Sequence, residues 1–232
     1  MREANRAIQR ERHISPTLDD LIHDLNGACV FSHLDLRSGY HQLEIHPDSR
    51  YITTFSTHLG LRRFKRLIFG ISSASETFQH TISQVLTGIP GARNISDDII
   101  VFGKGQNADE AQQMHDDSLQ KVLERLRVTG LTLNREKCEF NKPMLEFYGH
   151  TFGRHGMSPA PSKVAAINKC SAPTNPSEVR SLLGMGTFCA RYIPNYADLT
   201  KPLRDLTKND TPWIWGSAQQ KALDDFQVSI DQ

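Results

Sequence analysis

The feature that most constrains this chain is a pair of adjacent acids, Asp97 and Asp98, inside an otherwise apolar run. Ile95 precedes the pair, and residues 99–102 after it are apolar throughout. Such a run predicts a strand, yet two neighbouring carboxylates in a core would lose their hydration and repel each other. A turn that exposes both acids, or a bound cation, removes this conflict. The run therefore predicts a hairpin tip that presents both carboxylates to metal.

An Asp-Asp pair alone is a weak signal, because the chain contains four of them: Asp19-Asp20, Asp97-Asp98, Asp116-Asp117 and Asp224-Asp225. The other three lie in polar stretches typical of helices, where a solvated acid is the ordinary interpretation. Asp35 offers a further carboxylate, because it too lies in an apolar segment, at residues 31–36. An edge-strand acid that faces water explains Asp35 equally well.

Three such carboxylates suit one chemistry in particular. Phosphoryl transfer to a growing strand uses two Mg²⁺ ions about 3.5–4 Å apart, which stabilise the attacking and leaving oxygens. Mg²⁺ prefers carboxylate oxygens and substrate phosphates as ligands. Such a site needs about three carboxylates from separate strands at the open edge of a sheet, and Asp35 is the natural third ligand beside Asp97 and Asp98.

Hydrophobic periodicity predicts mixed strands and helices first, and mainly helices afterwards. Strands are expected at 30–36, 41–46, 51–56, 95–102, 131–133 and 145–152. Helices are expected at 16–27, 73–86, 108–129, after Asn175 and at 221–230. In the helix at 108–129 one buried stripe is expected, formed by Leu119, Val122, Leu123 and Leu126. This order is typical of an α+β domain with a helical appendage.

Cap residues support three of these helices. Thr17 and Asp20 resemble a capping pair before the first helix, and Gly130 supplies a stop after the helix at 108–129. Asn175 is suited to an N-cap, because proline follows it and Glu178 stands three residues later.

Composition allows a folded core and restricts the remaining classes. The 232 residues, 38% apolar and 23% charged, fit one large or two smaller domains. The net charge of +1 neither indicates nor excludes a nucleic-acid partner. The cysteines are far apart without a CxxC pair, so we interpret them as reduced thiols of an intracellular protein. No apolar run or N-terminal stretch suggests a membrane span or a secretory signal.

Six segments, in order, resemble the polymerase motifs of gypsy-type LTR-retrotransposon reverse transcriptases. They are FSHLDLRSGYHQ (31–42), FGISSASETFQ (69–79), NISDDIIVF (94–102), GLTLN with KCEF (130–134 and 137–140), EFYGH (146–150) and EVRSLLG (178–184). The resemblance implies a right-hand polymerase fold of the α+β class. Fingers and palm with an antiparallel sheet would occupy 1–153, and a helical thumb 154–205. Residues 206–232 resemble the truncated start of a linker and ribonuclease H region.

The resemblance also implies an activity, RNA-directed DNA polymerisation, in which a primer 3′-hydroxyl attacks the α-phosphate of a dNTP and pyrophosphate leaves. Asp35, Asp97 and Asp98 would hold two Mg²⁺ ions, with Mn²⁺ as an alternative, and the Leu36 carbonyl would be an additional ligand. Tyr40 matches the steric gate that excludes a 2′-hydroxyl, although a core tyrosine after a turn is the plain alternative.

Other motif positions imply contacts to the substrates. Phe69 and Gly70 would border the nucleotide and the template, unless Gly70 is an ordinary turn glycine. Contacts to nucleic acid are implied for Tyr148 and Gly149 in the primer-grip hairpin and for Arg180, Gly184 and Phe188 in the thumb helix. Plain helix packing explains Phe188 at least as well. Template phosphate is a candidate partner of the basic residues Arg62, Arg63, Lys65 and Arg66.

The implied partners are an RNA or DNA template with its primer, dNTP, and the remainder of a pol polyprotein with ribonuclease H and integrase. The compartment, a cytoplasmic particle or the nucleus, stays open. Residues 1–5 resemble the second half of a fingers motif, so the fingertip strands are expected upstream and dNTP binding by this chain is expected to be weak.

Two alternatives remain. One is a truncated or domesticated retroelement remnant that binds nucleic acid without catalysis, which the missing fingertip favours and the three intact acids disfavour. The other is an unrelated α+β metal-dependent phosphotransferase, which the order of the motifs disfavours.

Overall fold

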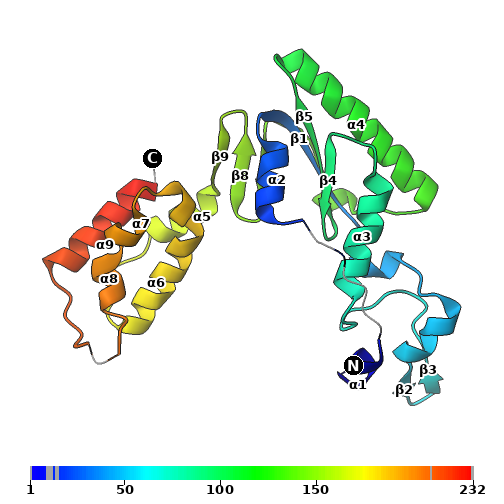
Figure 1. Cartoon of the computed structure of the whole chain (residues 1–232), viewed down its shortest axis with the longest axis horizontal. Coiled ribbons are helices and arrows are strands. Elements are labelled where there is room, and N and C mark those ends of the chain that lie inside the picture. The colour runs from blue at the N-terminus through cyan, green and yellow to red at the C-terminus, as the bar shows by residue number, and fades with distance from the viewer. Residues whose placement is uncertain (1, 9–12, 14–15, 210, 231–232) are drawn as a thin grey trace. The chain divides into compact units, whose positions relative to one another are not determined.

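The protein forms two compact units in the computed structural model, which describes residues 2–8, 13, 16–209 and 211–230 (Figure 1). Met1–Leu145 with Gly153–Gly156 form the first, which we call the sheet unit. Glu146–Phe152 with Met157–Gln232 form the second, which we call the helical unit.

The sheet unit is built around an antiparallel sheet of four strands in the order β4-β5-β1-β6. These strands are β1 (Ala28–Asp35), β4 (Ala92–Ile95), β5 (Asp98–Lys104) and β6 (Glu139–Lys142). A separate hairpin consists of β2 (Phe55–Thr57) and β3 (Gly60–Arg62). The helices are α1 (Arg2–Ala7), α2 (Leu18–Leu25), α3 (Ala74–Leu86) and α4 (Ala108–Thr129), with 3₁₀ helices η1 (Gly39–Gln42), η2 (Pro47–Thr53) and η3 (Arg135–Lys137).

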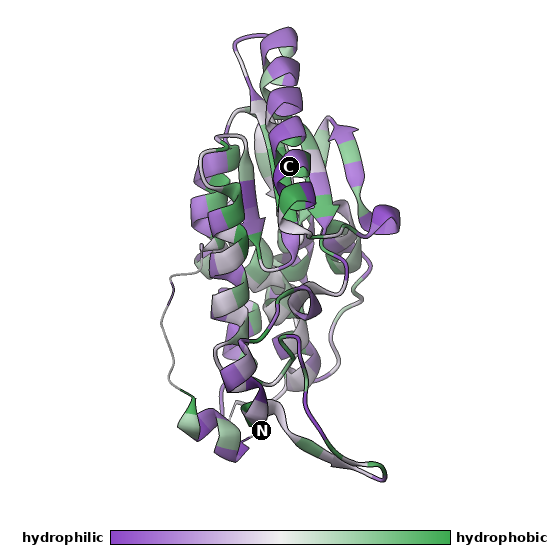
Figure 2. Cartoon of the chain, turned by 90° about the vertical axis from the view of Figure 1, so that its right-hand side faces the viewer, coloured by the Kyte–Doolittle hydropathy of each residue, from purple (hydrophilic) through white to green (hydrophobic). Residues whose placement is uncertain are grey.

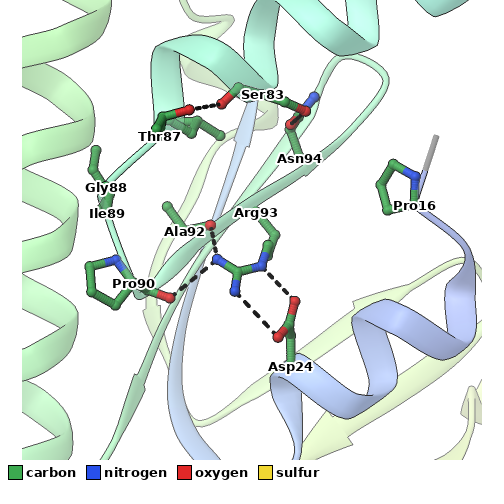
Figure 3. Close-up of a pocket in the computed structure, with 11 residues that line it drawn as sticks. Pro16, Asp24, Ser83, Thr87, Gly88, Ile89, Pro90, Ala92, Arg93 and Asn94 are labelled. Carbon is green, nitrogen blue, oxygen red and sulfur yellow. Dashed lines mark hydrogen bonds and ion pairs between the residues drawn. The ribbon is translucent and has the colours of Figure 1, made fainter. Parts of the chain in front are cut away.

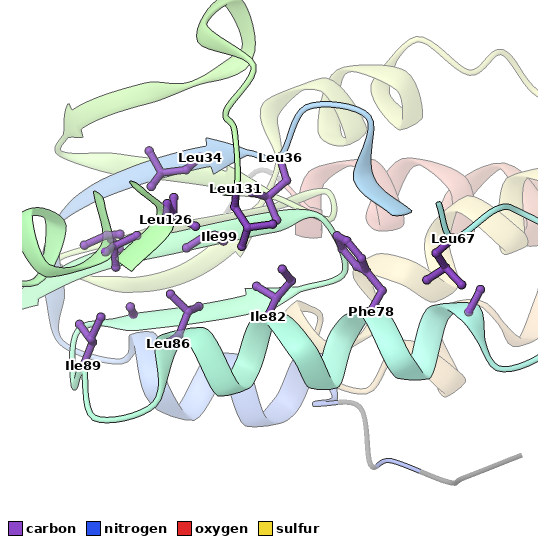
Figure 4. Close-up of a cluster of buried hydrophobic side chains, with 14 residues drawn as sticks. Leu34, Leu36, Leu67, Phe78, Ile82, Leu86, Ile89, Ile99, Leu126 and Leu131 are labelled. Atoms are coloured by element: carbon purple, nitrogen blue, oxygen red, sulfur yellow. The ribbon is translucent and has the colours of Figure 1, made fainter. Parts of the chain in front are cut away.

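The main core of the sheet unit lies between the sheet and the helices α3 and α4 (Figure 4). Leu34 of β1 and Ile99 of β5 pack there against Ile82 of α3, and all three are fully buried. Burying each such side chain contributes about 1.5–3 kcal/mol. Because side chains alternate across a strand, the neighbours Asp35 and Asp98 lie on the opposite face of the sheet.

The three predicted helices of this unit are confirmed, and so are two of their caps. The Thr17 hydroxyl accepts the Asp20 N–H at 3.2 Å, and the Asp20 carboxylate accepts the Thr17 N–H at 2.8 Å, which completes the capping box. Gly130 ends α4 with a φ of +74°. Leu123 was expected in the buried stripe of α4 but is 40% exposed, because it lies about 100° around the helix from the buried Val122.

The strands predicted at 41–46 and 51–56 are largely wrong. The first stretch begins within η1. In the second stretch, η2 covers residues 51–53, and only residues 55 and 56 enter β2. Pro47 starts η2, where its fixed φ suits a helical turn. Residues 41–46 alternate like a strand, yet their only bridge among the described residues pairs Glu44 with Arg66.

Two other predicted strands also differ. Residues 131–133 make a single bridge, Leu36 with Leu133. Residues 145–152 divide into β7 (Met144–Phe147) and β8 (His150–Gly153), which form a three-stranded sheet with β9 (Gly156–Pro159). Tyr148 and Gly149 have φ values of +48° and +77°, so the chain turns there, although its apolar pattern runs on.

The helical unit contains the helices α5 (Pro161–Asn168), α6 (Pro176–Cys189), α7 (Tyr196–Leu199), α8 (Lys201–Asp205) and α9 (Ser217–Ile230), with the 3₁₀ helix η4 (Ala190–Tyr192). Asn175 caps α6 as expected, because its side chain accepts the Glu178 N–H at 3.0 Å. Phe226 of α9 is fully buried in the same core as Leu182 of α6. The described part of 206–232 thus packs with 157–205, and the division of these residues into a thumb and a later region stays a prediction.

Hydrophobic residues are concentrated on the central strands, whereas the helices carry alternating hydrophilic and hydrophobic residues (Figure 2). Among the described residues, no helix is long and apolar enough to cross a membrane. All four cysteines are free, and Cys189 is buried in the helical unit.

Candidate active site

Strand pairing brings two of the three predicted acids together. Asp35 ends β1 and Asp98 begins β5, and the register of these antiparallel strands places them directly opposite each other. Both lie on the face of the sheet away from α3 and α4. Directly opposed residues on one face have Cβ atoms about 4.5–5.5 Å apart. Two strands that are distant in sequence therefore deliver two carboxylates to one place.

The third acid lies in the turn next to this pair. Ile95 of β4 pairs with Asp98 of β5, which leaves Ser96 and Asp97 as the turn residues. The Asp97 carbonyl accepts the Leu36 N–H at 2.9 Å, so the turn is tied to the end of β1. This confirms the predicted hairpin tip, with Asp97 and Asp98 both half-buried.

Two basic side chains contact the acids. The Lys137 ammonium lies 3.3 Å from the Asp35 carboxylate, which is on a residue only 8% exposed. The His33 Nε2 lies 2.7 Å from Asp98 Oδ1. The hydrogen bond to Asp98 raises the pKa of His33, against the opposing effect of burial. Lys137 balances part of the negative charge that the three acids would otherwise concentrate, and His33 does so when it is protonated.

These two basic residues were not expected from the sequence. His33 could have been found, because it lies two residues before Asp35 and so shares its face of β1. Lys137 follows α4 in the chain and reaches the site only because β6, which begins at Glu139, pairs with β1. Lys137 is the first residue of the KCEF segment, but nothing in that segment alone predicts a contact with Asp35.

The donor set suits a hard divalent cation, since it consists of carboxylate oxygens at the end of a sheet. Among the described residues, however, no group of three or more His, Cys, Asp or Glu side chains stands in the geometry of a metal centre. Asp98 directs one oxygen to His33 and Asp35 directs one to Lys137. The Leu36 carbonyl accepts the Gly39 N–H at 3.3 Å and keeps a second lone pair.

The predicted nucleotide-binding residues lie close together. The Tyr40 ring is 4.9 Å from Phe69 and 5.1 Å from Phe78, measured between centroids. Phe78 is fully buried in α3, whereas Phe69 is 68% exposed. Tyr40 is therefore braced on one side by the core and is half-buried.

The loop after Phe69 is held by α1. Asn5 donates its side-chain amide to the Gly70 carbonyl at 2.8 Å and accepts the Ser72 N–H at 3.0 Å. Gly70 has a φ of +88°, as a turn glycine would. The loop thus has a defined conformation, and a contact to nucleotide or template stays a prediction.

The predicted basic residues at 62, 63, 65 and 66 are all exposed. Arg66 donates to the Gln42 carbonyl at 2.7 Å and pairs with Glu44 at 3.3 Å, so part of its role is structural. Contact of these residues with template phosphate stays a prediction.

The predicted nucleic-acid contacts of the helical unit lie on β7, β8 and α6. Tyr148 is 55% exposed at the turn between β7 and β8. A Cβ added to Gly149 would lie 2.9 Å from Phe188 Cζ, so this glycine packs directly on that ring. Phe188 also stacks on His150, with centroids 4.4 Å apart. Packing of α6 on this hairpin thus involves Phe188, and its contact with nucleic acid stays a prediction.

The remaining two positions lie on the outer surface of α6. Gly184 has open space where a side chain would stand. Arg180 is exposed and donates to the Thr207 carbonyl at 2.9 Å, within the helical unit. Whether either residue contacts a duplex stays a prediction.

A pocket of about 510 Å³ lies beside the other end of β4 from the acids (Figure 3). Its polar lining includes an ion pair between Arg93 and Asp24 at 2.5 Å, and Arg93 also donates to the Ala92 carbonyl at 2.7 Å. These bonds tie α2 to β4. The pocket has no carboxylate in common with the candidate active site.

Comparison with known proteins places this geometry in a family. Residues 1–152 match the family model described as reverse transcriptase (RNA-dependent DNA polymerase). The chain belongs to this family. The resemblance drawn from its motifs is therefore confirmed.

Similar curated proteins are retrotransposon polyproteins. The chain is 33% identical over 212 residues to the retrovirus-related Pol polyprotein from transposon 297 of Drosophila melanogaster, covering 90% of the chain and 20% of that protein. It is 32% identical over 224 residues to the retrovirus-related Pol polyprotein from transposon 412 of Drosophila melanogaster, covering 96% of the chain and 18% of that protein. It is 26% identical over 228 residues to the transposon Tf2-3 polyprotein of Schizosaccharomyces pombe, covering 97% and 17%. The chain thus spans a fifth or less of the length of these relatives.

Similar solved structures share the fold. The foamy viral protease–reverse transcriptase dRH in complex with double-stranded DNA has a TM-score of 0.83 at 22% identity, covering 99% of this chain and 40% of that one. The foamy viral protease–reverse transcriptase in complex with RNA/DNA hybrid has a TM-score of 0.78 at 21% identity, covering 99% and 31%. The predicted α+β polymerase fold is therefore confirmed.

Proposed function

We propose that this reverse transcriptase domain carries out RNA-directed DNA synthesis at a site formed by Asp35, Asp97 and Asp98. The observation that carries the proposal is the pairing of Asp35 with Asp98 across two strands, with Asp97 in the adjoining turn. These acids would hold two divalent cations, Mg²⁺ or alternatively Mn²⁺. When bound, such ions neutralise charge on the transferring phosphoryl group and on the attacking and leaving oxygens.

The chain's own residues would position the reactants. The Leu36 N–H holds the Asp97 backbone, and the Leu36 carbonyl offers one further oxygen to a cation. Tyr40, braced by Phe78, would limit the space beneath the sugar of an incoming dNTP. Lys137 contacts one oxygen of Asp35 and His33 contacts one oxygen of Asp98, and cations would compete with them for these two oxygens.

The proposed substrates are an RNA or DNA template with its primer, and dNTP. The solved neighbours bound to double-stranded DNA and to RNA/DNA hybrid support a duplex as ligand. Tyr148, Gly149, Arg180 and Gly184 are the residues that we propose to contact it. The relatives are Pol polyproteins, which supports a partnership with further domains of a polyprotein. We propose ribonuclease H and integrase as these domains.

Primer extension on an RNA template in Mg²⁺ tests the proposal. Asp98→Asn should reduce extension at least about a thousandfold, because metal stabilisation contributes several kcal/mol and about 1.4 kcal/mol corresponds to tenfold. The matched control is Asp117→Asn in the Asp-Asp pair of α4, where the carboxylate accepts only from Gln113 at 2.9 Å among the described residues. Equal extension by wild type and Asp98→Asn would contradict the proposal.

A second candidate is a domain that binds nucleic acid without catalysis. The direction of the Asp35 and Asp98 oxygens, towards Lys137 and His33, favours it. In that case wild-type protein would bind a labelled RNA/DNA hybrid in fluorescence anisotropy and would extend no primer at any Mg²⁺ or Mn²⁺ concentration.

A further inference from the structure

We infer that Gln79 is a positioning residue whose buried side chain fixes the turn that carries Asp97. Gln79 lies in α3 and is 4% exposed. Its side-chain hydrogen bonds join it to Ser83, Asn94 and Ser96 rather than to the three acids. The consequence for metal binding rests on the proposed function, whereas the hold on the turn does not.

One amide group spans the backbone on both sides of Ile95. Gln79 Oε1 accepts the Ser96 N–H at 2.6 Å, and Gln79 Nε2 donates to the Asn94 carbonyl at 2.9 Å. β4 is an edge strand of the sheet, so alternate backbone groups along it have no neighbouring strand to pair with. Gln79 supplies both the acceptor and the donor that such a strand would provide.

The amide is itself held by a small polar network. Ser83 lies one turn further along α3, accepts from Gln79 Nε2 at 3.3 Å and donates its hydroxyl to Asn94 Oδ1 at 2.9 Å. The contact between Ser83 and Asn94 is visible at the edge of the pocket in Figure 3. Asn94 is also 4% exposed. Buried polar groups that satisfy one another in this way specify a single arrangement.

The turn needs such support, because Ser96 has a φ of +55°. Residues with a side chain rarely adopt this conformation, and it persists only where the surroundings impose it. Gln79 holds the turn from α3 at Ser96, and Leu36 holds it from β1 at Asp97. Without the first contact, the backbone of the turn would be held from one side only, at Asp97.

Removing the amide should therefore loosen the turn and weaken cation binding. Gln79→Met preserves side-chain length and removes both hydrogen bonds. We expect the Ser96 amide to exchange its hydrogen about tenfold faster in metal-free protein, and Mn²⁺ to bind about tenfold more weakly. Changes of residues that orient metal ligands typically cost about 10–100-fold in metal affinity.

The experiment measures hydrogen exchange at Ser96, Mn²⁺ binding by electron paramagnetic resonance, and the Mg²⁺ dependence of primer extension, all on the full chain. Gln84→Met is the matched control, because Gln84 is exposed on the same helix and its amide contacts the His80 side chain at 2.9 Å. It should leave all three readouts unchanged. Gln79→Asn keeps the amide but is too short to span both groups, and it serves if Gln79→Met does not fold.

Unchanged exchange at Ser96 in a folded Gln79 variant would overturn the inference. Faster exchange with unchanged Mn²⁺ affinity would overturn its consequence for the metal site. If wild-type protein neither binds Mn²⁺ nor extends a primer, the proposed function fails, and exchange at Ser96 still decides whether Gln79 holds the turn.

Discussion

Two of the two-residue hairpin turns in this protein lie at candidate functional residues. The hairpin of β4 and β5 turns at Ser96 and Asp97, and the hairpin of β7 and β8 turns at Tyr148 and Gly149. Both turns contain a residue with a side chain at positive φ, +55° at Ser96 and +48° at Tyr148. Each therefore adopts a backbone that requires support from outside the turn.

The balance of the support differs. In the first turn the Ser96 N–H donates to Gln79 Oε1, and the Asp97 carbonyl accepts the Leu36 N–H. The second turn is backed by the ring of Phe188, which packs against Gly149, and the Gly149 carbonyl accepts the Ala160 N–H at 2.8 Å. Hydrogen bonds are directional and fix the backbone while leaving the Asp97 carboxylate available. Ring packing fixes the backbone by excluded volume, so it tolerates no added atom.

The largest effect on stability is expected at the second turn, where Phe188 leaves no room for a side chain at Gly149. Gly149→Ala should destabilise the helical unit by about 3 kcal/mol, because a left-handed φ costs an L residue about 1–2 kcal/mol and the clash of the new Cβ with Phe188 adds about 1–3 kcal/mol. Both tryptophans of the chain, Trp213 and Trp215, lie in this unit. Their fluorescence during urea unfolding therefore reports on its stability.

A double-mutant cycle separates the two contributions. In a Phe188→Leu background the contact with the ring tip is absent, so Gly149→Ala should cost only the backbone part, about 1–2 kcal/mol. An equal cost in both backgrounds would show that Phe188 does not restrict this turn.

The next effect concerns His150, which follows the second turn and is 2% exposed. Burial, and then the charge of Arg191, lowers the pKa of His150 below 6.5. The unfolded chain therefore binds the proton more readily than the folded one. Stability of the helical unit should be fully present above pH 6.5 and should fall as the pH drops through the lowered pKa.

His150→Phe should flatten this dependence. The ring retains stacking on Phe188 but cannot take a proton, and the contact of His150 Nδ1 with the Tyr192 hydroxyl at 2.5 Å is lost. Tryptophan-monitored unfolding between pH 5 and 8 measures the slope in both proteins. An unchanged slope in the variant would assign the pH dependence to other groups.

The smallest effect is expected at Tyr148. Asparagine tolerates positive φ better than tyrosine, so Tyr148→Asn should stabilise the hairpin by about 0.5 kcal/mol, after loss of the edge contact with Phe147 at 4.5 Å. If Tyr148 contacts the duplex as proposed, the same variant binds an RNA/DNA hybrid more weakly in anisotropy. Unchanged binding would remove Tyr148 from the proposed interface.

Local sequence rules predicted the features whose interactions lie within a short segment, such as helix caps. The capping box of Thr17 with Asp20 and the N-cap at Asn175 satisfy nearby N–H groups, so their signals are complete within four residues. Residues 41–46 show where such rules fail. Their alternation of apolar and polar residues is that of a strand. A strand, however, also needs a neighbouring strand to pair with, and distant residues decide whether one lies beside it.

The sequence by itself determined that Asp97 and Asp98 stand at a hairpin tip. Two adjacent carboxylates in an apolar run would lose their hydration and repel each other unless a turn exposes them. The ordered motifs determined the family. Only the tertiary structure decided that Asp35 faces Asp98, that Lys137 and His33 contact these acids, and that Gln79 holds their turn. Strand register and side-chain hydrogen bonds between distant elements depend on how the whole core packs, which no single segment encodes.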